Sequence, residues 1–409
     1  MSWRTAAVEQ RPRRLWLAYS SGAFGLAMIA QSGFLVPLRA RELGASFDVI
    51  GLVVGAGAVA AVFASVPSGA LIDRLGPKRT FVVGAGACVV LSLLFPLVTN
   101  YWWFLALQPL LGLARNLGWV ASQSYITSIG SEQERPTLTG RFSFFSNVGQ
   151  MAGPLLVGAA AEVVGFRWAF VVPAAYALCF VVVGLLLVET RSPRQEQDRV
   201  PQGAGVRSAW QLLALRGIQV ALLLTFGRLW ITVVYTTFLP VYLVDKGFDP
   251  VVVGAVVATS GLVAAVLAPT AGFWTRYVSQ ATAAACALAG GAVALLLIPH
   301  VAVMPWVFVV PVLVGVGIGV SLPLLLSIVT TAAPEGRRGV ALGLRSMATQ
   351  TAMTAAPLVV GPLITILGMA LGFTAAAAVA ASLLAGARML SASGRLHPVT
   401  TEHPAADQP

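Results

Sequence analysis

The sequence predicts an all-α membrane protein with twelve transmembrane helices in two six-helix bundles. Three observations support this prediction: the composition, the number of long apolar runs and an internal repeat. Hydrophobic residues make up 57% of the 409-residue chain and charged residues only 10%, whereas a soluble domain carries about a quarter charged residues. The net charge of +11 comes from basic residues between apolar runs, which is typical of membrane topology and not of nucleic-acid binding.

Each apolar run is long enough to cross a bilayer as a helix, which takes about 20 residues. In the first half of the chain the runs cover approximately residues 15–38, 49–72, 80–98, 102–129, 142–165 and 168–188. In the second half they cover approximately residues 213–243, 251–275, 281–299, 303–331, 341–366 and 369–390. The first run follows basic residues, as in a signal peptide, but it is too long for the apolar part of one. We therefore expect it to be a retained helix.

Basic residues indicate which helix ends face the cytoplasm. Lys and Arg are concentrated in the two tails, in the polar stretch between the halves and in alternate short loops. Because such residues stay on the cytoplasmic side, we expect a multi-pass protein of the cytoplasmic membrane with both termini in the cytoplasm. The predicted parts are a cytoplasmic tail at 1–14, a bundle at 15–188, a cytoplasmic linker at 189–210, a bundle at 211–390 and a cytoplasmic tail at 391–409.

The two halves of the chain repeat each other. A shift of 203 residues places glycine on glycine at 44/247, 51/254, 69/272, 112/315, 140/343, 158/361 and 165/368, and proline on proline at 37/240, 96/299 and 154/357. The same shift aligns Glu42-Leu-Gly44 with Asp245-Lys-Gly247. Because six helices restore the original direction of the chain, the repeats are parallel and related by an axis along the membrane normal. Two bundles facing each other across a central cavity are the expected architecture.

A short charged loop, Gly69–Arg79, joins the second and third runs. Gly76-Pro77 cannot continue a helix, and Asp73 lies at a helix carboxyl end, where a negative charge is unfavourable without a cation or another helix amino terminus nearby. We expect this loop to act in a conformational switch. The residues that would carry the switch are Gly69, Asp73, Arg74, Gly76, Lys78 and Arg79.

This loop resembles the signature between helices 2 and 3 of the major facilitator superfamily. Arg115-Asn116-Leu-Gly118 resembles the helix-4 arginine motif of that family, and Gly165-Phe-Arg-Trp-Ala-Phe170 resembles its turn between helices 5 and 6. Gly149-x3-Gly153-Pro154 resembles a motif associated with its antiporters. The resemblance covers about residues 12–392 and implies secondary transport by alternating access.

The resemblance also implies roles for two of these motifs. Asp73 would dock on the amino end of helix 11, near Gly339–Gly343, and stabilise a state closed toward the cytoplasm. Gly149, Gly153 and Pro154 would act in conformational switching; alternatively, they allow close helix packing and bend the helix.

Ionisable residues within membrane spans are costly and therefore candidates for function. Arg115 and Arg228 are the basic residues deep within runs, and no Asp or Glu lies mid-span in helices 1, 4, 7 or 10. This favours neutral, anionic or zwitterionic cargo over cationic cargo. The candidate cargo-binding residues are Arg115, Asn116, Trp119, Gln123, Gln31, Arg228, Tyr235 and Gln350, although each polar side chain could instead bridge helices.

These observations predict a monomeric secondary transporter in the lipid bilayer that exports a small organic molecule, drug-like or metabolite, with proton coupling left open. The alternatives are uptake or facilitated diffusion of an organic anion and a non-transporting sensor or scaffold. The sequence shows no catalytic constellation, no metal-ligand spacing and no Walker-type phosphate loop, so we expect no enzyme activity, no metal and no cofactor.

Overall fold

The computed structural model describes residues 3–129, 135–188, 210–300, 303–334 and 337–392. This part of the chain forms helices and turns, without a strand. The first half contains α1 (Trp3–Glu42), α2 (Phe47–Leu75), α3 (Pro77–Leu94), η1 (Phe95–Leu97), α4 (Trp103–Ser128), α5 (Arg135–Ala169) and α6 (Val171–Leu186). The second half contains α8 (Arg216–Asp245), α9 (Pro250–Leu267), η2 (Ala268–Thr270), α10 (Ala271–Trp274), α11 (Gln280–Leu297), η3 (Trp306–Phe308), α12 (Val309–Ala332), α13 (Arg338–Leu367) and α14 (Met369–Ala392).

Each of the twelve predicted runs is helical, as one helix or as a helix with an adjoining short helical segment, which confirms the all-α membrane fold. In the described residues, nine helices are long and apolar enough to cross a membrane by length and composition. The helices α2 and α6 contribute shorter apolar stretches, at Phe47–Ala61 and Val171–Leu186. The remaining predicted span, α4, carries Arg115 and Asn116 in its interior, which lowers its hydropathy.

Some helix boundaries differ from the predicted ones for local reasons. The first helix begins at Trp3, earlier than the apolar run, because a helix can continue beyond the residues that the bilayer requires. The run predicted at 251–275 is divided among α9, η2 and α10, with Pro269 in the first turn of η2, because proline removes a backbone donor. At Gly165, φ is 75° and ψ is 163°, so the helical segments on either side of it are separate spans.

The 203-residue repeat reappears as repeated backbone geometry. Gly44 and Gly247, which the repeat aligns, have φ of 88° and 86°, and Gly165 and Gly368 have φ of 75° and 81°. Residues with a side chain rarely adopt this region. Both pairs follow a long helix and turn the chain into the next one, so the repeat preserves turns as well as helices.

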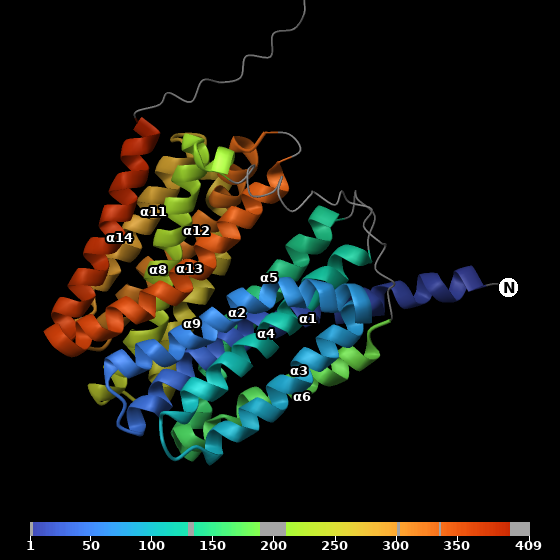
Figure 1. Cartoon of the computed structure of the whole chain (residues 1–409), viewed down its shortest axis with the longest axis horizontal. Helices are drawn as coiled ribbons and strands as arrows, with labels where there is room; N and C mark the ends of the chain where they lie inside the picture. The colour runs from blue at the N-terminus through green and yellow to red at the C-terminus, as the bar shows by residue number, and fades with distance from the viewer. Residues whose placement is uncertain (1–2, 130–134, 189–209, 301–302, 335–336, 393–409) are drawn as a thin grey trace, which may run out of the picture.

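The two halves of the chain form two helix bundles that meet mainly through α2 with α13, α5 with α9 and α1 with α8. Figure 1 shows the bundles touching where α1 and α8 end and diverging toward the opposite end. We call the end that contains Arg41 and Asp245 the outer end, after the predicted topology, and the opposite end the inner end.

The crossings between the bundles are built from repeat-related residues. A Cβ atom added at Gly254 on α9 would lie 2.6 Å from the Pro154 carbonyl oxygen and 3.3 Å from the Gly158 Cα on α5. The equivalent Cβ atom at Gly51 on α2 would collide with the Pro357 carbonyl on α13 and lie 3.3 Å from the Gly361 Cα. The same glycine–proline arrangement therefore brings the bundles into backbone contact at two symmetric places.

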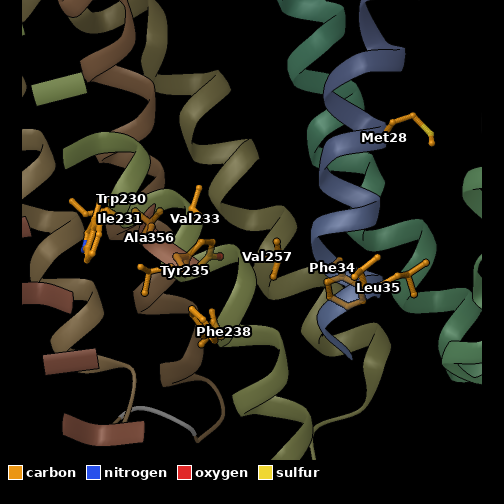
Figure 2. Packing of buried hydrophobic residues seen from close by; sticks show 14 of the residues in the cluster. Met28, Phe34, Leu35, Trp230, Ile231, Val233, Tyr235, Phe238, Val257 and Ala356 are labelled. Carbon is orange, nitrogen blue, oxygen red and sulfur yellow. The ribbon is translucent and has the colours of Figure 1, made fainter. Parts of the chain in front are cut away.

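Buried apolar side chains continue from one bundle to the other near the outer end. In Figure 2, Val257 of α9 lies between Tyr235 of α8 and Phe34 of α1, and all three belong to one buried cluster. The rings of Phe47 and Phe238, one from each bundle, lie 6.5 Å apart. The bundles are thus sealed against each other here by a packed core.

Candidate functional site

The deepest polar cluster of the N-terminal bundle surrounds Arg115 on α4. This residue lies thirteen positions before the inner end of α4 at Ser128, which is about 20 Å at 1.5 Å per residue. Its Nη1 donates a hydrogen bond to the Ser32 hydroxyl on α1, whereas its Nε is buried without a partner. One edge of the guanidinium is thus held against α1, and the Nε–H of Arg115 is left as an unused hydrogen-bond donor.

Two amide side chains near this level also have unpaired polar atoms. Gln31 is fully buried, and neither its Nε2 nor its Oε1 has a hydrogen-bond partner. Asn116 is half-buried with an unpaired Nδ2. Since buried polar groups in proteins normally have partners, Gln31, Asn116 and Arg115 are suited to hydrogen-bond a small polar molecule or water.

The predicted cargo-binding residues Trp119 and Gln123 of α4 have different environments. The Trp119 ring packs directly over Gly25 on α1 and lies 5.7 Å from the Phe142 ring on α5. These contacts give Trp119 a packing role between three helices. Gln123 is exposed, one turn closer to the inner end.

In the C-terminal bundle, Arg228 lies on α8 and Arg345 on α13, two helices that pack along each other. Both residues are half-buried, and the Nε of each is buried without a partner. The sequence analysis identified Arg228 but did not single out Arg345, because Arg345 lies in the first turns of its apolar run.

The other two residues predicted in this bundle have different environments. Tyr235 is fully buried, and its hydroxyl donates to the Val256 carbonyl oxygen on α9 at 3.3 Å. This bond and the surrounding apolar side chains (Figure 2) connect α8 to α9 inside the bundle. Gln350 on α13 is half-buried.

The predicted switch residues of α5 lie at contacts with two other helices. Gly149 packs on the Ala23 backbone of α1, and a Cβ atom at Gly153 would lie 3.2 Å from the Ala27 carbonyl oxygen and 3.3 Å from the Gln31 Cγ. Pro154 offers its carbonyl to the close approach of Gly254. The motif thus brings α5 close to α1 and, one turn later, close to the opposite bundle.

The charged loop between α2 and α3 is described in part. Gly76, with φ of 82°, ends α2 and begins α3, and its carbonyl oxygen accepts a hydrogen bond from the Thr80 hydroxyl at 2.9 Å. Arg74 and Arg79 are exposed and Lys78 is half-buried. The side chain of Asp73 and the surroundings of Gly69 lie outside the described residues, so their role stays a prediction.

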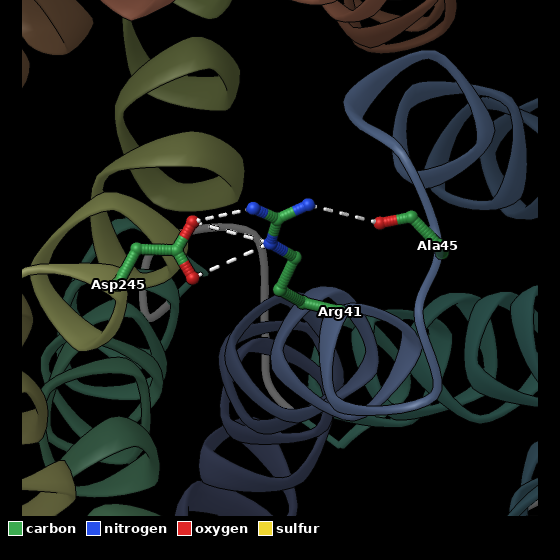
Figure 3. A network of polar contacts seen from close by, with 3 residues as sticks. All are labelled: Arg41, Ala45 and Asp245. Carbon is green, nitrogen blue, oxygen red and sulfur yellow. Dashed lines mark hydrogen bonds and ion pairs between the residues drawn. The ribbon is translucent and has the colours of Figure 1, made fainter.

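The sequence analysis missed an ion pair that joins the bundles at the outer end. Arg41, in the last turn of α1, donates from Nη2 and Nε to the Asp245 carboxylate at the end of α8, at 2.9 and 3.1 Å. Its Nη1 donates to the Ala45 carbonyl oxygen at 3.4 Å (Figure 3), and its guanidinium lies 4.7 Å from the Phe47 ring centroid. The repeat had aligned Asp245 with Glu42, which was a signal that both positions carry an acid at a helix end.

A second polar contact crosses the bundles beside this ion pair. The Thr365 hydroxyl on α13 accepts from the Asp48 backbone N–H at 3.0 Å and donates to the Asp48 Oδ1 at 3.1 Å. We call the Arg41–Asp245 pair, the Asp48–Thr365 contact and the two glycine–proline crossings the outer gate. In the described residues, no group of three or more His, Cys, Asp or Glu side chains could hold a metal ion.

Comparisons with known proteins agree with this architecture. Residues 15–357 match the Major Facilitator Superfamily. An uncharacterised MFS-type transporter of Methanocaldococcus jannaschii is 21% identical over 62% of this chain and 65% of its own length. The multidrug resistance protein MdtG of Dickeya zeae is 28% identical over 39% of this chain and 40% of its own. The matches to these relatives thus span less than two thirds of their lengths.

Solved structures show the same fold at low sequence identity. A mutant of the nucleoside transporter NupG superposes with a TM-score of 0.78 at 14% identity, over 92% of this chain and 100% of that one. A bacterial homologue of the human lysosomal transporter Spinster, in an inward-facing and unoccupied conformation, gives a TM-score of 0.72 at 14% identity, over 93% and 96%. With the family match covering most of the chain, the protein belongs to the Major Facilitator Superfamily.

Proposed function

We propose that this protein is a secondary transporter that exports a small organic molecule across the cytoplasmic membrane by alternating access, acting as a monomer. The observation that carries the proposal is a pair of repeat-related bundles that touch through symmetric glycine–proline crossings and hold unpaired polar groups at mid-depth. Crossings without side chains let the bundles close tightly and separate again, which rocking around a fixed site requires.

The structure corresponds to one of the two end states of this cycle. With the predicted topology, the outer gate closes the extracellular side, and the bundles diverge toward the cytoplasm (Figure 1). Cargo would enter from the cytoplasm in this state. Rocking would then break the Arg41–Asp245 pair and close the inner end, where Asp73 is predicted to dock on the amino end of α13.

Export is favoured over uptake by the MdtG proteins, which are named for multidrug resistance. The direction can be tested by comparing culture medium and cell extract by untargeted mass spectrometry, for cells that express the wild type or Gly254→Val. The valine side chain would overlap the α5 backbone at the crossing and stop rocking. Export predicts a compound that is depleted in wild-type cells and enriched in their medium.

The compound found in this way is then tested in proteoliposomes that contain the purified protein. Counterflow of the labelled compound, with and without a pH gradient, measures transport and its coupling to protons. No difference between wild type and Gly254→Val in either compartment would contradict transport and support a sensor or scaffold.

Uptake of an organic anion is the second candidate, because Arg115 and Arg228 lie deep in the bundles with no ion-pair partner in the described residues. The same mass-spectrometry comparison separates the two candidates. Uptake predicts enrichment in the cells and depletion from the medium.

A further inference from the structure

Arg228 and Arg345 are carried by two helices, α8 and α13, whose inner ends lie at the same level. Arg337, just before α13, donates from Nη1 to the Gln211 Oε1, just before α8, at 2.8 Å, so the inner ends of the two helices lie side by side. From there Arg228 is twelve positions into α8 and Arg345 seven positions into α13, or about 18 and 10 Å along the helix axes. These helices pack along each other, so the two arginines lie on neighbouring helices of the same bundle.

These two guanidiniums can still bind a ligand. The Nε of each is buried without a hydrogen-bond partner. Arginine stays protonated in proteins, and its planar fork matches the oxygens of a carboxylate or a phosphate. Each residue thus has at least one guanidinium donor that no described residue uses.

Among the side chains that the structure describes, no carboxylate pairs with Arg228 or Arg345. The acidic side chains that the structure describes are all near the outer end: Glu42, Asp48, Glu162, Asp245 and Asp249. Two like charges that share a partly buried site repel each other and lose hydration, which makes an unpaired pair costly. A counter-ion from outside the protein would remove both costs.

We propose that Arg228 and Arg345 bind an oxyanion group of the cargo, a carboxylate or a phosphate, and that the cargo is therefore an organic anion. This inference rests on the proposed transport function and specifies its substrate class. The anion enters from the inner end, bridges α8 and α13, and supplies a negative charge that no described carboxylate provides at this place.

The test measures thermal unfolding of the purified full-length protein with benzoate, phenyl phosphate or neutral benzamide, at constant ionic strength. Either anion is expected to raise the melting temperature of the wild type, and benzamide is not. Arg228→Gln and Arg345→Gln are expected to abolish this shift. Arg388→Gln, on the exposed face of α14, is the control and should retain it. Benzoate and phenyl phosphate separate a preference for carboxylate from one for phosphate.

A second readout excludes a merely structural role. Without added anion, Arg228→Gln is expected to melt at a higher temperature than the wild type, because it removes an uncompensated charge. A structural arginine bonded to neighbouring groups would give a lower melting temperature instead. A lower value, or anion shifts that are equal in the wild type and both Gln variants, would overturn the proposal.

The failure of this inference is distinguishable from the failure of the proposed function. Transport of a neutral compound with unchanged kinetics in both Gln variants would refute the anion site and leave transport intact. An anion shift without any transported compound would leave the site intact and refute transport.

Discussion

Arg41 and Arg228 illustrate two ways in which this protein uses an arginine. Arg41 is about one-third exposed and has a carboxylate, a carbonyl and an aromatic ring around it. Arg228 is deeper, and its described surroundings contain a second arginine and no acid. The first is suited to hold two bundles together reversibly, whereas the second is suited to bind something that the protein does not supply.

Replacing Arg41 with Gln should open the outer gate more often. An exposed ion pair contributes about 0.2–1 kcal/mol, so the ratio of open to closed molecules should rise by up to about fivefold. The measurement is labelling of Val257→Cys by a membrane-impermeant maleimide added outside cells, in a variant without the native cysteines. Lys246→Gln, next to Asp245 but outside the pair, is the control. Equal labelling of Arg41→Gln and the parent protein would show that the pair does not hold the gate.

How far single residues could be predicted depends on whether their partners are close in the sequence. Arg115 and Arg228 were identified because a charge in the middle of an apolar run is conspicuous by itself. Arg41 and Arg345 were not singled out, because Arg41 lies just beyond the first apolar run and Arg345 lies in the first turns of its run. The partner of Arg41 is also distant, since Asp245 is 204 residues away. Tyr235 was placed among cargo-binding residues on polarity alone, whereas the structure gives its hydroxyl a carbonyl partner.

At the scale of helices, the gate depends on glycines that the repeat had already paired. Gly51 and Gly254, and likewise Gly158 and Gly361, were aligned by the 203-residue shift and occupy equivalent places at the two crossings. Gly112 and Gly315 also correspond, since they approach the carbonyls of Gly57 and Ser260, which are themselves 203 residues apart. The sequence could identify these positions but not their contacts, because the shift does not tell which bundle each glycine faces.

Substitution of Gly254 by Ala should prevent full closure of the outer gate. The added Cβ would lie 2.6 Å from the Pro154 carbonyl oxygen, and backbone of two packed helices can give way only at a cost of about 1–3 kcal/mol. Val257→Cys labelling from outside should rise and transport should slow. Gly86→Ala is the matched control, since a Cβ there meets nothing within 4 Å. Gly51→Ala should act like Gly254→Ala; a defect at one crossing alone would refute their equivalence.

The charged loop Gly69–Arg79, before α3, should act at the inner end of the molecule, opposite to the outer gate. If Asp73 docks on the amino end of α13, Asp73→Asn weakens a contact of up to about 2 kcal/mol and favours the state that is open toward the cytoplasm. Cross-linking between cytoplasmic helix ends should then fall, with membrane insertion unchanged. Arg388→Gln, on the exposed face of α14, controls for a general loss of charge, and unchanged cross-linking in Asp73→Asn would contradict the docking.

At the scale of the whole molecule, two packed bundles share one closed contact region and separate elsewhere (Figure 1). Composition and periodicity were sufficient to predict the helices and their division into bundles, since both depend on the bilayer and on local sequence. The conformational state could not be predicted in this way. It depends on a balance between contacts at the two ends, and each contact joins residues that are far apart in the sequence.

Rigid-body rocking makes a strong prediction for a link across the outer gate. Asp48→Cys and Thr365→Cys replace side chains that contact each other across the gate, with oxygens 3.1 Å apart. The yield of oxidation measures whether the two Cβ atoms come within the roughly 3.5–4.5 Å that a disulfide requires. In a background without Cys88, Cys179 and Cys286, oxidation of the double variant should lock the outer gate and stop counterflow, and a reductant should restore it. Each single variant under the same oxidant should transport normally. Continued transport with the disulfide fully formed would mean that cargo crosses without separation of the bundles at this end, and alternating access as proposed would be wrong.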